Sequence, residues 1–509
     1  MMNYGLPAYQ VNTASLGLFV AYPFFRTSCF HLLLDLSVQY HSSARSSGMF
    51  GPGWQFSYSS TVAVSLAEKK ILLKKSTGHV LAFEMVIQPD FAARPYYELK
   101  PVGNDRERMY EYPDSYLYED RKRKQFYKYR KTGGQGANLL WQVMDNCGNA
   151  MTFQYRTDGR LEAAVDPFGR VIRFKQEHPS CSTGMLLPDG RETTITYDAQ
   201  GRMANIVNFA GVPTAFTYDV SGRMDSIVVG KKQKTTKFAY TRKNGRDFIS
   251  MVTDRNGSVT KYEMASTNPE VVVVSGPDGT MRRYESRQGN TERMVDPDGS
   301  KLERVFQDGR PVAVTDKNGN RQTLGYDIRG NLILRTDAFG HVEMFVYDSR
   351  DNLVEHTDML GRTTKLSYDA RNNLAGMMRP DGSTALQQYD GFGRLVQVTQ
   401  PNGNNLNFEY DAFANITMIR DNYGCLYKAN MTIPDTTCWN GWMHKESGQR
   451  SGLMRWAGRW KLRTRTVRRN PPDMIAVPVC CPSIGQAIPG WLNGIRCPES
   501  PNASHHRAI

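Results

Sequence analysis

Tyrosine and aspartate stand side by side at seven places, and this pairing of a phenol with a carboxylate is the most repeated chemical feature of the chain. The pairs are Tyr197-Asp198, Tyr218-Asp219, Tyr326-Asp327, Tyr347-Asp348, Tyr368-Asp369, Tyr389-Asp390 and Tyr410-Asp411. Exposed rows of phenol rings could bind sugars, whereas buried rings brace a fold and an adjacent carboxylate accepts hydrogen bonds in a turn. We predict the bracing role, with sugar binding as the alternative.

The spacing of the pairs shows an internal repeat. The five pairs from Tyr326 to Asp411 follow one another at intervals of 21 residues, and Tyr197 and Tyr218 are separated by the same interval. Tyr155 lies two intervals of 21 residues before Tyr197. After Tyr218 an aromatic residue recurs at intervals of 22, at Tyr240, Tyr262, Tyr284 and Phe306. Self-similarity at this period indicates a repeat architecture of about a dozen units.

Each unit contains two turns and two strands. Asp337-Ala-Phe-Gly340 and Asp358-Met-Leu-Gly361 have the residues of tight turns, and Gly-Arg or Gly-Asn after each Tyr-Asp pair marks the second turn. Between turns, as at 341–347, apolar residues alternate with others, which is typical of a strand. We predict an all-β fold, a continuous curled antiparallel sheet of hairpin repeats with the two kinds of turn on opposite rims. A propeller is the competing fold, but its signature would recur at twice this period.

Two motifs resemble a known family. Tyr347-Asp-Ser-Arg-Asp-Asn-Leu353, followed by Asp358-Met-Leu-Gly-Arg362, keeps residue type and spacing over many units. This pattern resembles the YD repeats of Rhs proteins, teneurins and the C component of insecticidal toxin complexes, over residues 140–424. Arg45-Ser-Ser-Gly-Met-Phe-Gly-Pro-Gly-Trp54 is similar to a glycine-tryptophan motif near the start of bacterial Rhs cores, which favours the bacterial branch.

The resemblance implies a fragment of a polymorphic toxin core whose repeats coil into a hollow β-shell. Such a shell encloses a C-terminal toxin until delivery to a rival cell, often through a type VI secretion machine. The implied partners are an enclosed toxin domain and secretion-machine proteins, and the implied location is cytoplasmic until secretion, or extracellular. The second hypothesis is a surface carbohydrate-binding or adhesive protein.

Composition divides the chain into a β-rich N-terminal segment at 1–139, the repeat array at 140–424 and a tail at 425–509. The tail has 12 Lys and Arg against four Asp and Glu, which gives +8 of the net charge of +14. It is either a small basic nuclease toxin or, as we favour, out-of-frame translation after a frameshift in a longer gene. The frameshift hypothesis predicts a truncated array whose final strand, near Phe408 to Tyr410, has an unpaired edge.

Residues 121–131 are rich in Lys and Arg, with three aromatic residues between them, a composition found in nucleic-acid grooves. Acidic residues lie just upstream, namely Glu107, Glu111, Asp114, Glu119 and Asp120. We therefore expect a solvated strand paired with an acidic neighbour and argue against nucleic acid as a partner.

Sequence signatures of catalysis are absent, since there is no His-Glu-x-x-His, Gly-x-Ser-x-Gly or phosphate loop. We expect a non-enzymatic protein without cofactor or metal. Cys480-Cys481 and His505-His506 are weak metal-binding candidates, because they lack correctly spaced partners. No apolar run is long enough to span a membrane, and the apolar run at 16–25 lacks the charged start of a cleaved signal peptide.

The period also makes a prediction about burial. Because translation by 21 residues carries each residue onto its equivalent in the next unit, Tyr347, Tyr368 and Tyr389 should occupy equivalent and largely buried positions.

Overall fold

The computed structural model describes residues 6–30, 32–44, 47–87, 89–102, 107–132, 137–230, 234–243 and 245–428. Within these ranges the regular elements are all β strands, which confirms the predicted all-β class. No helix in this part of the chain is long and apolar enough to cross a membrane. The predictions for the tail beyond Lys428, including its nuclease and metal-binding candidates, concern residues outside the described ranges.

The N-terminal residues form two small sheets, one with the strand order β1-β2-β3-β6 and one that pairs β4 with β5. Their strands are β1 (Ala8–Val11), β2 (Leu18–Cys29), β3 (Leu32–His41), β4 (Ser47–Gly48), β5 (Gly51–Pro52) and β6 (Trp54–Phe56).

All later strands belong to one large sheet of 35 strands. Those before the first Tyr-Asp pair are β7 (Thr61–Ser65), β8 (Lys70–Lys74), β9 (Val80–Glu84), β10 (Tyr97–Leu99), β11 (Arg108–Glu111), β12 (Ser115–Asp120), β13 (Gln125–Arg130), β14 (Asn138–Asp145), β15 (Ala150–Tyr155), β16 (Leu161–Val165), β17 (Val171–Lys175) and β18 (Gly184–Leu186). The β7–β9 hairpins join the sheet where β7 pairs with β14.

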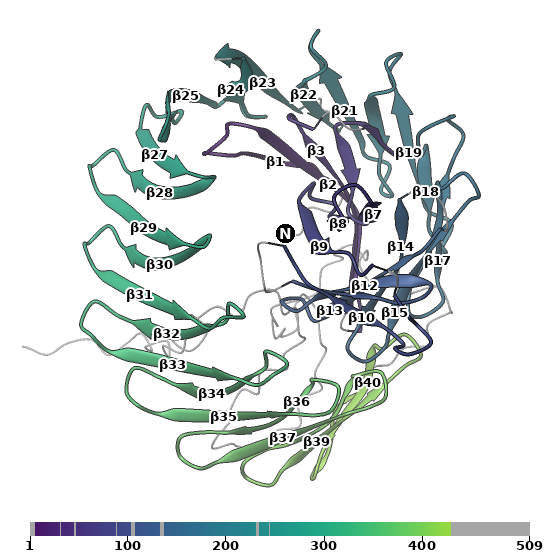
Figure 1. The fold of residues 1–509 in the computed structure, drawn as a ribbon, viewed down its shortest axis with the longest axis vertical. Coiled ribbons are helices and arrows are strands. Elements are labelled where there is room, and N and C mark those ends of the chain that lie inside the picture. The colour runs from purple at the N-terminus through teal and green to yellow at the C-terminus, as the bar shows by residue number, and fades with distance from the viewer. Residues whose placement is uncertain are drawn as a thin grey trace, which may run out of the picture. The chain divides into compact units, whose positions relative to one another are not determined.

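The strands from the first Tyr-Asp pair onward are β19 (Glu192–Tyr197), β20 (Met203–Val207), β21 (Pro213–Tyr218), β22 (Met224–Val229), β23 (Lys234–Lys243), β24 (Arg246–Thr253), β25 (Val259–Thr267), β26 (Glu270–Ser275), β27 (Met281–Arg287), β28 (Asn290–Val295), β29 (Lys301–Gln307), β30 (Arg310–Thr315), β31 (Arg321–Tyr326), β32 (Leu332–Thr336), β33 (Val342–Tyr347), β34 (Leu353–Thr357), β35 (Thr363–Tyr368), β36 (Leu374–Met378), β37 (Thr384–Tyr389), β38 (Leu395–Thr399), β39 (Asn405–Tyr410), β40 (Ile416–Asp421) and β41 (Gly424–Lys428). In Figure 1 the hairpins from β27 onward follow one another in chain order.

Consecutive strands from β10 to β41 pair with each other, and they do so antiparallel, so successive turns lie on opposite edges of the strip. The Tyr-Asp turns, such as 348–352, lie on one edge, which we call the Tyr-Asp rim. Turns such as 337–340 and 358–361 lie on the other edge, which we call the Asp-Gly rim. The predicted hairpin array with two rims is confirmed.

The predicted unpaired edge near Phe408 to Tyr410 is wrong. β39 is an internal strand that pairs with β38 and β40, and β40 pairs with β41. The Asp421 carboxylate accepts hydrogen bonds from the backbone N–H groups of Tyr423 and Gly424, both at 2.8 Å, which closes one more turn. Cys425, assigned from sequence to the irregular tail, is therefore part of a paired strand.

Each Tyr-Asp hairpin has a β-bulge immediately before its tyrosine. Between β33 and β34, Tyr347 is opposite Leu353 and Val346 is opposite Glu355, so Val354 has no residue directly across from it. The same register shift precedes Tyr197, Tyr218, Tyr326, Tyr368, Tyr389 and Tyr410. Because a bulge bends its strand and increases right-handed twist, a bulge in every hairpin makes the sheet curl in one direction.

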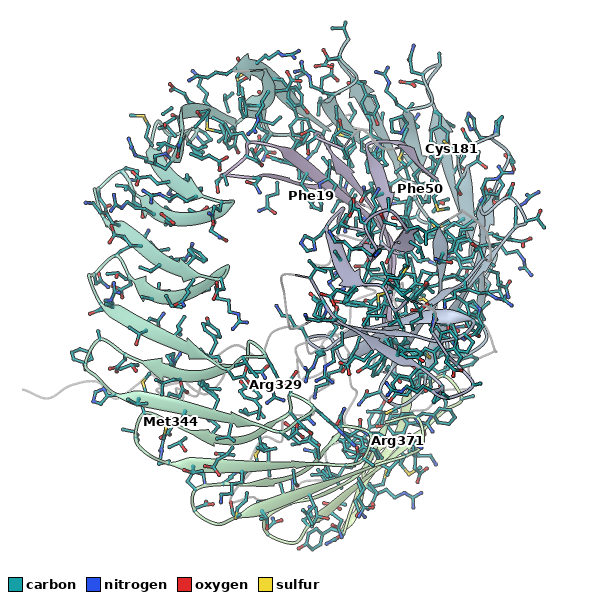
Figure 2. All side chains as sticks on the ribbon, in the orientation of Figure 1. Phe19, Phe50, Cys181, Arg329, Met344 and Arg371 are labelled. Carbon is teal, nitrogen blue, oxygen red and sulfur yellow. The ribbon has the colours of Figure 1, made fainter. Side chains whose placement is uncertain are left out.

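The large sheet has a second layer over only part of its length. The tyrosines and the residues at alternate positions share one side of the sheet, which we call the Tyr face. The N-terminal sheet packs on this face, as the Trp54 and Phe216 rings show at 5.0 Å, and β1–β3 lie beside β21–β24 in Figure 1. Among the described residues the main buried cluster ends at Val272 and its flanking rings at Tyr284. Most later repeats form a single layer, although Val398, Leu406 and Phe408 near the end of the array are buried apart from this cluster. Figure 2 shows the difference: side chains crowd around Phe50 and thin out around Met344.

Candidate functional site

The aspartate of each Tyr-Asp pair closes its own turn. In the first pair, the Asp198 backbone N–H donates to the carbonyl of Arg202, and the Gly201 N–H donates to the carbonyl of Asp198, both at 2.9 Å. The Asp198 carboxylate accepts from the backbone N–H groups of Gln200 and Arg202 and from the Arg202 side chain at 2.6 Å. Every oxygen of this carboxylate is therefore engaged within five residues of chain.

The same geometry recurs along both rims. The carboxylate accepts the backbone N–H four residues later at Asp219, Asp327, Asp348, Asp369, Asp390 and Asp411. On the Asp-Gly rim, Asp337 and Asp358 bind their turns in the same way. The two rims thus share this turn chemistry at these aspartates, whereas the turns that begin at Arg379 and Gln400 have no aspartate at that position.

Local hydrogen bonds favour the ionised form of the Asp219 and Asp348 carboxylates. Burial of Asp219 opposes its ionisation, but hydrogen bonds from the Arg223 side chain and backbone outweigh burial and lower its pKa. Burial likewise opposes ionisation of Asp348, and hydrogen bonds from Asn352 lower its pKa. A lowered pKa suits a permanent acceptor rather than a group that exchanges protons near neutral pH.

The tyrosine hydroxyl ties its strand to the strand before it. The Tyr368 hydroxyl donates to the carbonyl of Leu353 at 2.9 Å, 15 residues earlier. The equivalent bond is made by Tyr155, Tyr197, Tyr218, Tyr326 and Tyr410. The Tyr389 hydroxyl donates to the Gln387 side chain at 2.6 Å. The six bonds to carbonyls link their hairpins to the previous ones by a side chain as well as by strand pairing.

Tyr347, Tyr368 and Tyr389 do occupy equivalent positions at the ends of their strands, and none of the three is exposed. Each is partly buried rather than fully buried, because β33, β35 and β37 lie beyond the main buried cluster. Burial still raises the pKa of Tyr368 to about 12, with the Asp348 carboxylate adding to the effect.

Where the second layer is present, the tyrosines bind it directly. The Trp54 indole N–H donates to the Tyr218 hydroxyl at 3.0 Å, and the Met224 backbone N–H donates to the Tyr40 hydroxyl at 3.0 Å. Gly51 has φ +88°, and a Cβ there would lie 2.6 Å from the Gly201 carbonyl oxygen. The glycine-tryptophan motif therefore allows the N-terminal segment to approach a Tyr-Asp turn closely enough to place its indole.

One charged cluster lies on the Tyr face of the single layer. Glu343 lies between Arg335 at 2.7 Å and His356 at 2.8 Å, and the His356 ring stacks on Phe345. Glu343 and His356 are both buried. These side chains pair with one another across adjacent strands, and in the described ranges no three or more His, Cys, Asp or Glu side chains are grouped to hold a metal ion.

Arginines link successive turns of the Tyr-Asp rim. Arg329 donates to the carbonyl of Asp348 at 2.7 Å, and Arg350 donates to the carbonyl of Ala370 at 2.9 Å. Arg202 lies over the ring of Tyr218, with its guanidinium carbon 4.8 Å from the ring centroid. Arg202 belongs to the Gly201-Arg202 signature, whereas Arg329 and Arg350 lie two residues after Asp327 and Asp348 and outside that signature.

The two rims also meet each other, which the sequence did not predict. Arg121, in the turn after β12, pairs with Asp351 in the turn after β33 at 2.5 Å, and Lys124 donates to the Asn352 side chain at 2.7 Å. The turn after β14 and the turns after β35 and β37 are joined by contacts of Asn146 with Arg371, Cys147 with Asn373 and Asn149 with Phe392. Phe168, after β16, packs on Phe413, after β39. We call this set the rim contact. Figure 2 labels Arg329 and Arg371 on its Tyr-Asp side.

The basic segment at 121–131 is divided between two environments. β13 pairs with β12. Lys131 forms an ion pair with Glu111 at 2.8 Å, and Arg123 lies 3.9 Å from Asp120. These contacts agree with the predicted acidic neighbour. Arg121 and Lys124 instead belong to the rim contact. Three of the seven basic residues in this segment, Arg121, Arg123 and Lys131, therefore have an acidic partner within the chain.

Comparison with protein families identifies the repeats. The model of the RHS repeat matches residues 307–342, 347–384 and 389–424. The protein contains RHS repeats. The YD-repeat resemblance is confirmed for these residues, and the hairpins upstream continue the same turn chemistry. A search of curated proteins found no match.

Three solved structures are similar to this RHS-repeat chain. They are a Tc holotoxin pore of Photorhabdus luminescens (13% identity, TM-score 0.40, covering 80% of this chain and 26% of that chain), a TcdB2–TccC3–Cdc42 complex (12%, 0.40, 81% and 27%) and a TcdB2–TccC3 complex (12%, 0.38, 82% and 28%). The chain thus spans about a quarter of the length of the solved chains that it matches.

Proposed function

We propose that this chain forms part of the wall of an Rhs-type shell, and that its Tyr-Asp residues are structural rather than catalytic. The observation that carries the proposal is the internal use of the repeated groups. The Tyr368 hydroxyl donates a hydrogen bond to a backbone carbonyl of the neighbouring strand, and the Asp390 carboxylate accepts hydrogen bonds from Arg394 in its own turn. Side chains engaged in this way are poorly placed to transfer protons or to recognise a ligand.

The occupant that we propose for the shell is a toxin polypeptide held until delivery to another cell. The rim contact supports this, because it joins early turns to late turns and so covers part of two edges that would otherwise be exposed. Secretion proteins, with a type VI machine as the first choice, would then be the partners that carry the loaded shell. The protein would remain in the cytoplasm until that step.

Protection of a cargo peptide tests enclosure. A short protease-sensitive peptide fused after Ile509 should be cleaved much more slowly than the same peptide fused before Met1. Denaturing the wall should abolish the difference. Equal cleavage of the two fusions in the folded protein would refute enclosure by this chain.

Carbohydrate binding is the second candidate, and one observation favours it. The tyrosines of the Tyr-Asp pairs from Tyr326 to Tyr410 are partly buried, so part of each side chain remains open to a ligand. Glycan-array binding that disappears in Tyr347→Ala but persists in Leu360→Ala, a change at an exposed turn residue, would support this alternative over the purely structural role.

The nuclease hypothesis concerns residues 425–509. Growth arrest with DNA or RNA cleavage when this segment alone is expressed would support it, and normal growth would count against it. Either result leaves the structural role of the repeats intact.

A further inference from the structure

We propose that the rim contact is a latch: the two rims separate reversibly while the hairpins on both sides stay folded. This property does not depend on any cargo and goes beyond the wall function. It concerns turns about 225 residues apart in sequence, as in the Asn146–Arg371 and Cys147–Asn373 contacts.

The kind of bonding is the first argument. Within the sheet, neighbouring strands such as β35 and β36 are joined by backbone pairing over several residues. Across the rim contact, the described residues show side-chain contacts and no strand pairing. Segments with few backbone hydrogen bonds between them open at lower free energy than paired strands, so separation should start here.

The chemistry of the contact is the second argument. Arg121 and Asp351 are each 12% exposed and form an ion pair that Arg329 shares at 3.0 Å. Lys124, Asn146 and Asn149 contribute polar contacts. When the rims part, water can hydrate every one of these groups, which offsets much of the lost attraction. Opening a polar contact of this kind is less costly than exposing an apolar core of equal area.

An aromatic group gives the latch a defined closed position. Phe30, in the turn after β2, stacks on Phe392 with ring centroids 5.4 Å apart and also contacts Phe168 at 4.6 Å. Phe168 in turn meets Phe413 from the last Tyr-Asp turn. These rings come from both rims and from the N-terminal sheet, so they meet only when the latch is closed.

Two native cysteines allow opening to be measured. Cys147 is part of the rim contact, with its sulfur 3.7 Å from the Asn373 side-chain oxygen. Cys181, between β17 and β18, is 3% exposed and takes no part in the rim contact. Cys147 is already partly exposed, so opening of the latch should raise its rate of reaction with a thiol reagent and leave Cys181 protected, whereas global unfolding exposes both.

The test compares the labelling rates of the two cysteines, read by mass spectrometry of peptides from the full chain. Asp351→Asn removes the charge that holds Arg121 but tolerates the same backbone, because Asp351 has φ +61° and Asn adopts this region readily. Asp308→Asn is the matched control, since Asp308 has φ +51° in an exposed turn outside the contact. We expect Asp351→Asn to accelerate labelling of Cys147 by about tenfold, with Cys181 unchanged, and the control to change neither.

A second variant closes the latch instead of weakening it. Asn373→Cys places a thiol beside Cys147, and added oxidised glutathione would convert the two thiols to a disulfide while being reduced itself. The cross-linked 147–373 peptide should form, and reduction of the disulfide should make Cys147 available to the thiol reagent again. If Cys147 and Cys181 respond together to Asp351→Asn, or if Cys147 does not respond at all, the latch proposal is wrong.

Discussion

The hydrogen bond from Trp54 to Tyr218 allows one contribution of the second layer to the free energy of unfolding to be measured. In Tyr218→Phe the ring remains, but the hydroxyl that donates to the Met203 carbonyl at 2.8 Å and accepts the Trp54 indole N–H at 3.0 Å is lost. The first loss costs about 1 kcal/mol, the net value of an ordinary hydrogen bond. Trp54 has 0% exposure, so its unpaired N–H adds about 1–3 kcal/mol. We expect Tyr218→Phe to lower the free energy of unfolding by about 2–4 kcal/mol in total.

Tyr326→Phe is the matched control, because Tyr326 donates to the Pro311 carbonyl at 2.9 Å and lies in the single-layered part of the sheet. Its expected cost is about 1 kcal/mol. Urea unfolding followed by circular dichroism gives both values, provided that the slope with denaturant is unchanged. A double variant with Trp54→Phe should recover part of the loss, because it removes the donor that Tyr218→Phe leaves unpaired. Equal destabilisation by the two Tyr→Phe changes would refute the argument.

Four further changes have expected outcomes. Asp390→Ala should cost about 1–2 kcal/mol by removing a turn cap, measured by urea unfolding. Gly51→Ala should destabilise by more than about 1 kcal/mol, because its φ of +88° and the close Gly201 carbonyl oxygen both disfavour a Cβ; thermal unfolding measures this. The lowered pKa values of Asp219 and Asp348 mean that their contribution to stability is present above the ordinary pKa of about 3.9 and is lost as pH falls through the lowered values, as acid titration of the folded fraction should show. The neutral Tyr368 phenol contributes fully below the ordinary pKa of about 10, and this contribution is lost as pH rises through about 12, which tyrosinate absorbance and circular dichroism should record together.

The repeat period and the turn residues were sufficient to predict the hairpins, their antiparallel order and the two rims. These features depend on residues close together in sequence, as in 337–340, where one aspartate and one glycine determine the turn. The period was also sufficient to place Tyr347, Tyr368 and Tyr389 at equivalent positions. It could not give their burial, because burial depends on whether another layer covers that stretch of sheet.

The bulges and the rim contact could not be predicted from the period. A bulge before Tyr347 changes no residue type, and it appears only when the register on both sides of the turn is known. The rim contact depends on twist accumulated over the strands from β12 to β33, so small errors in each hairpin would move Arg121 away from Asp351. The run of Lys and Arg at 121–124 was visible in the sequence, but its partners were too distant to be inferred.

The single and double layers give the two parts of the sheet different sources of stability. Around Phe216 the Tyr face is covered, and apolar burial supports the strands in addition to their pairing. In β33 the opposite face leaves Met344 and Val346 about half exposed, at 46% and 50%, so these residues contribute little through burial. The later repeats must rely mainly on strand pairing and on the tyrosine bonds between hairpins. Weakening the rim contact should therefore separate the late turns from the early ones and leave the hairpins on both sides folded, because their strand pairing does not depend on the rims.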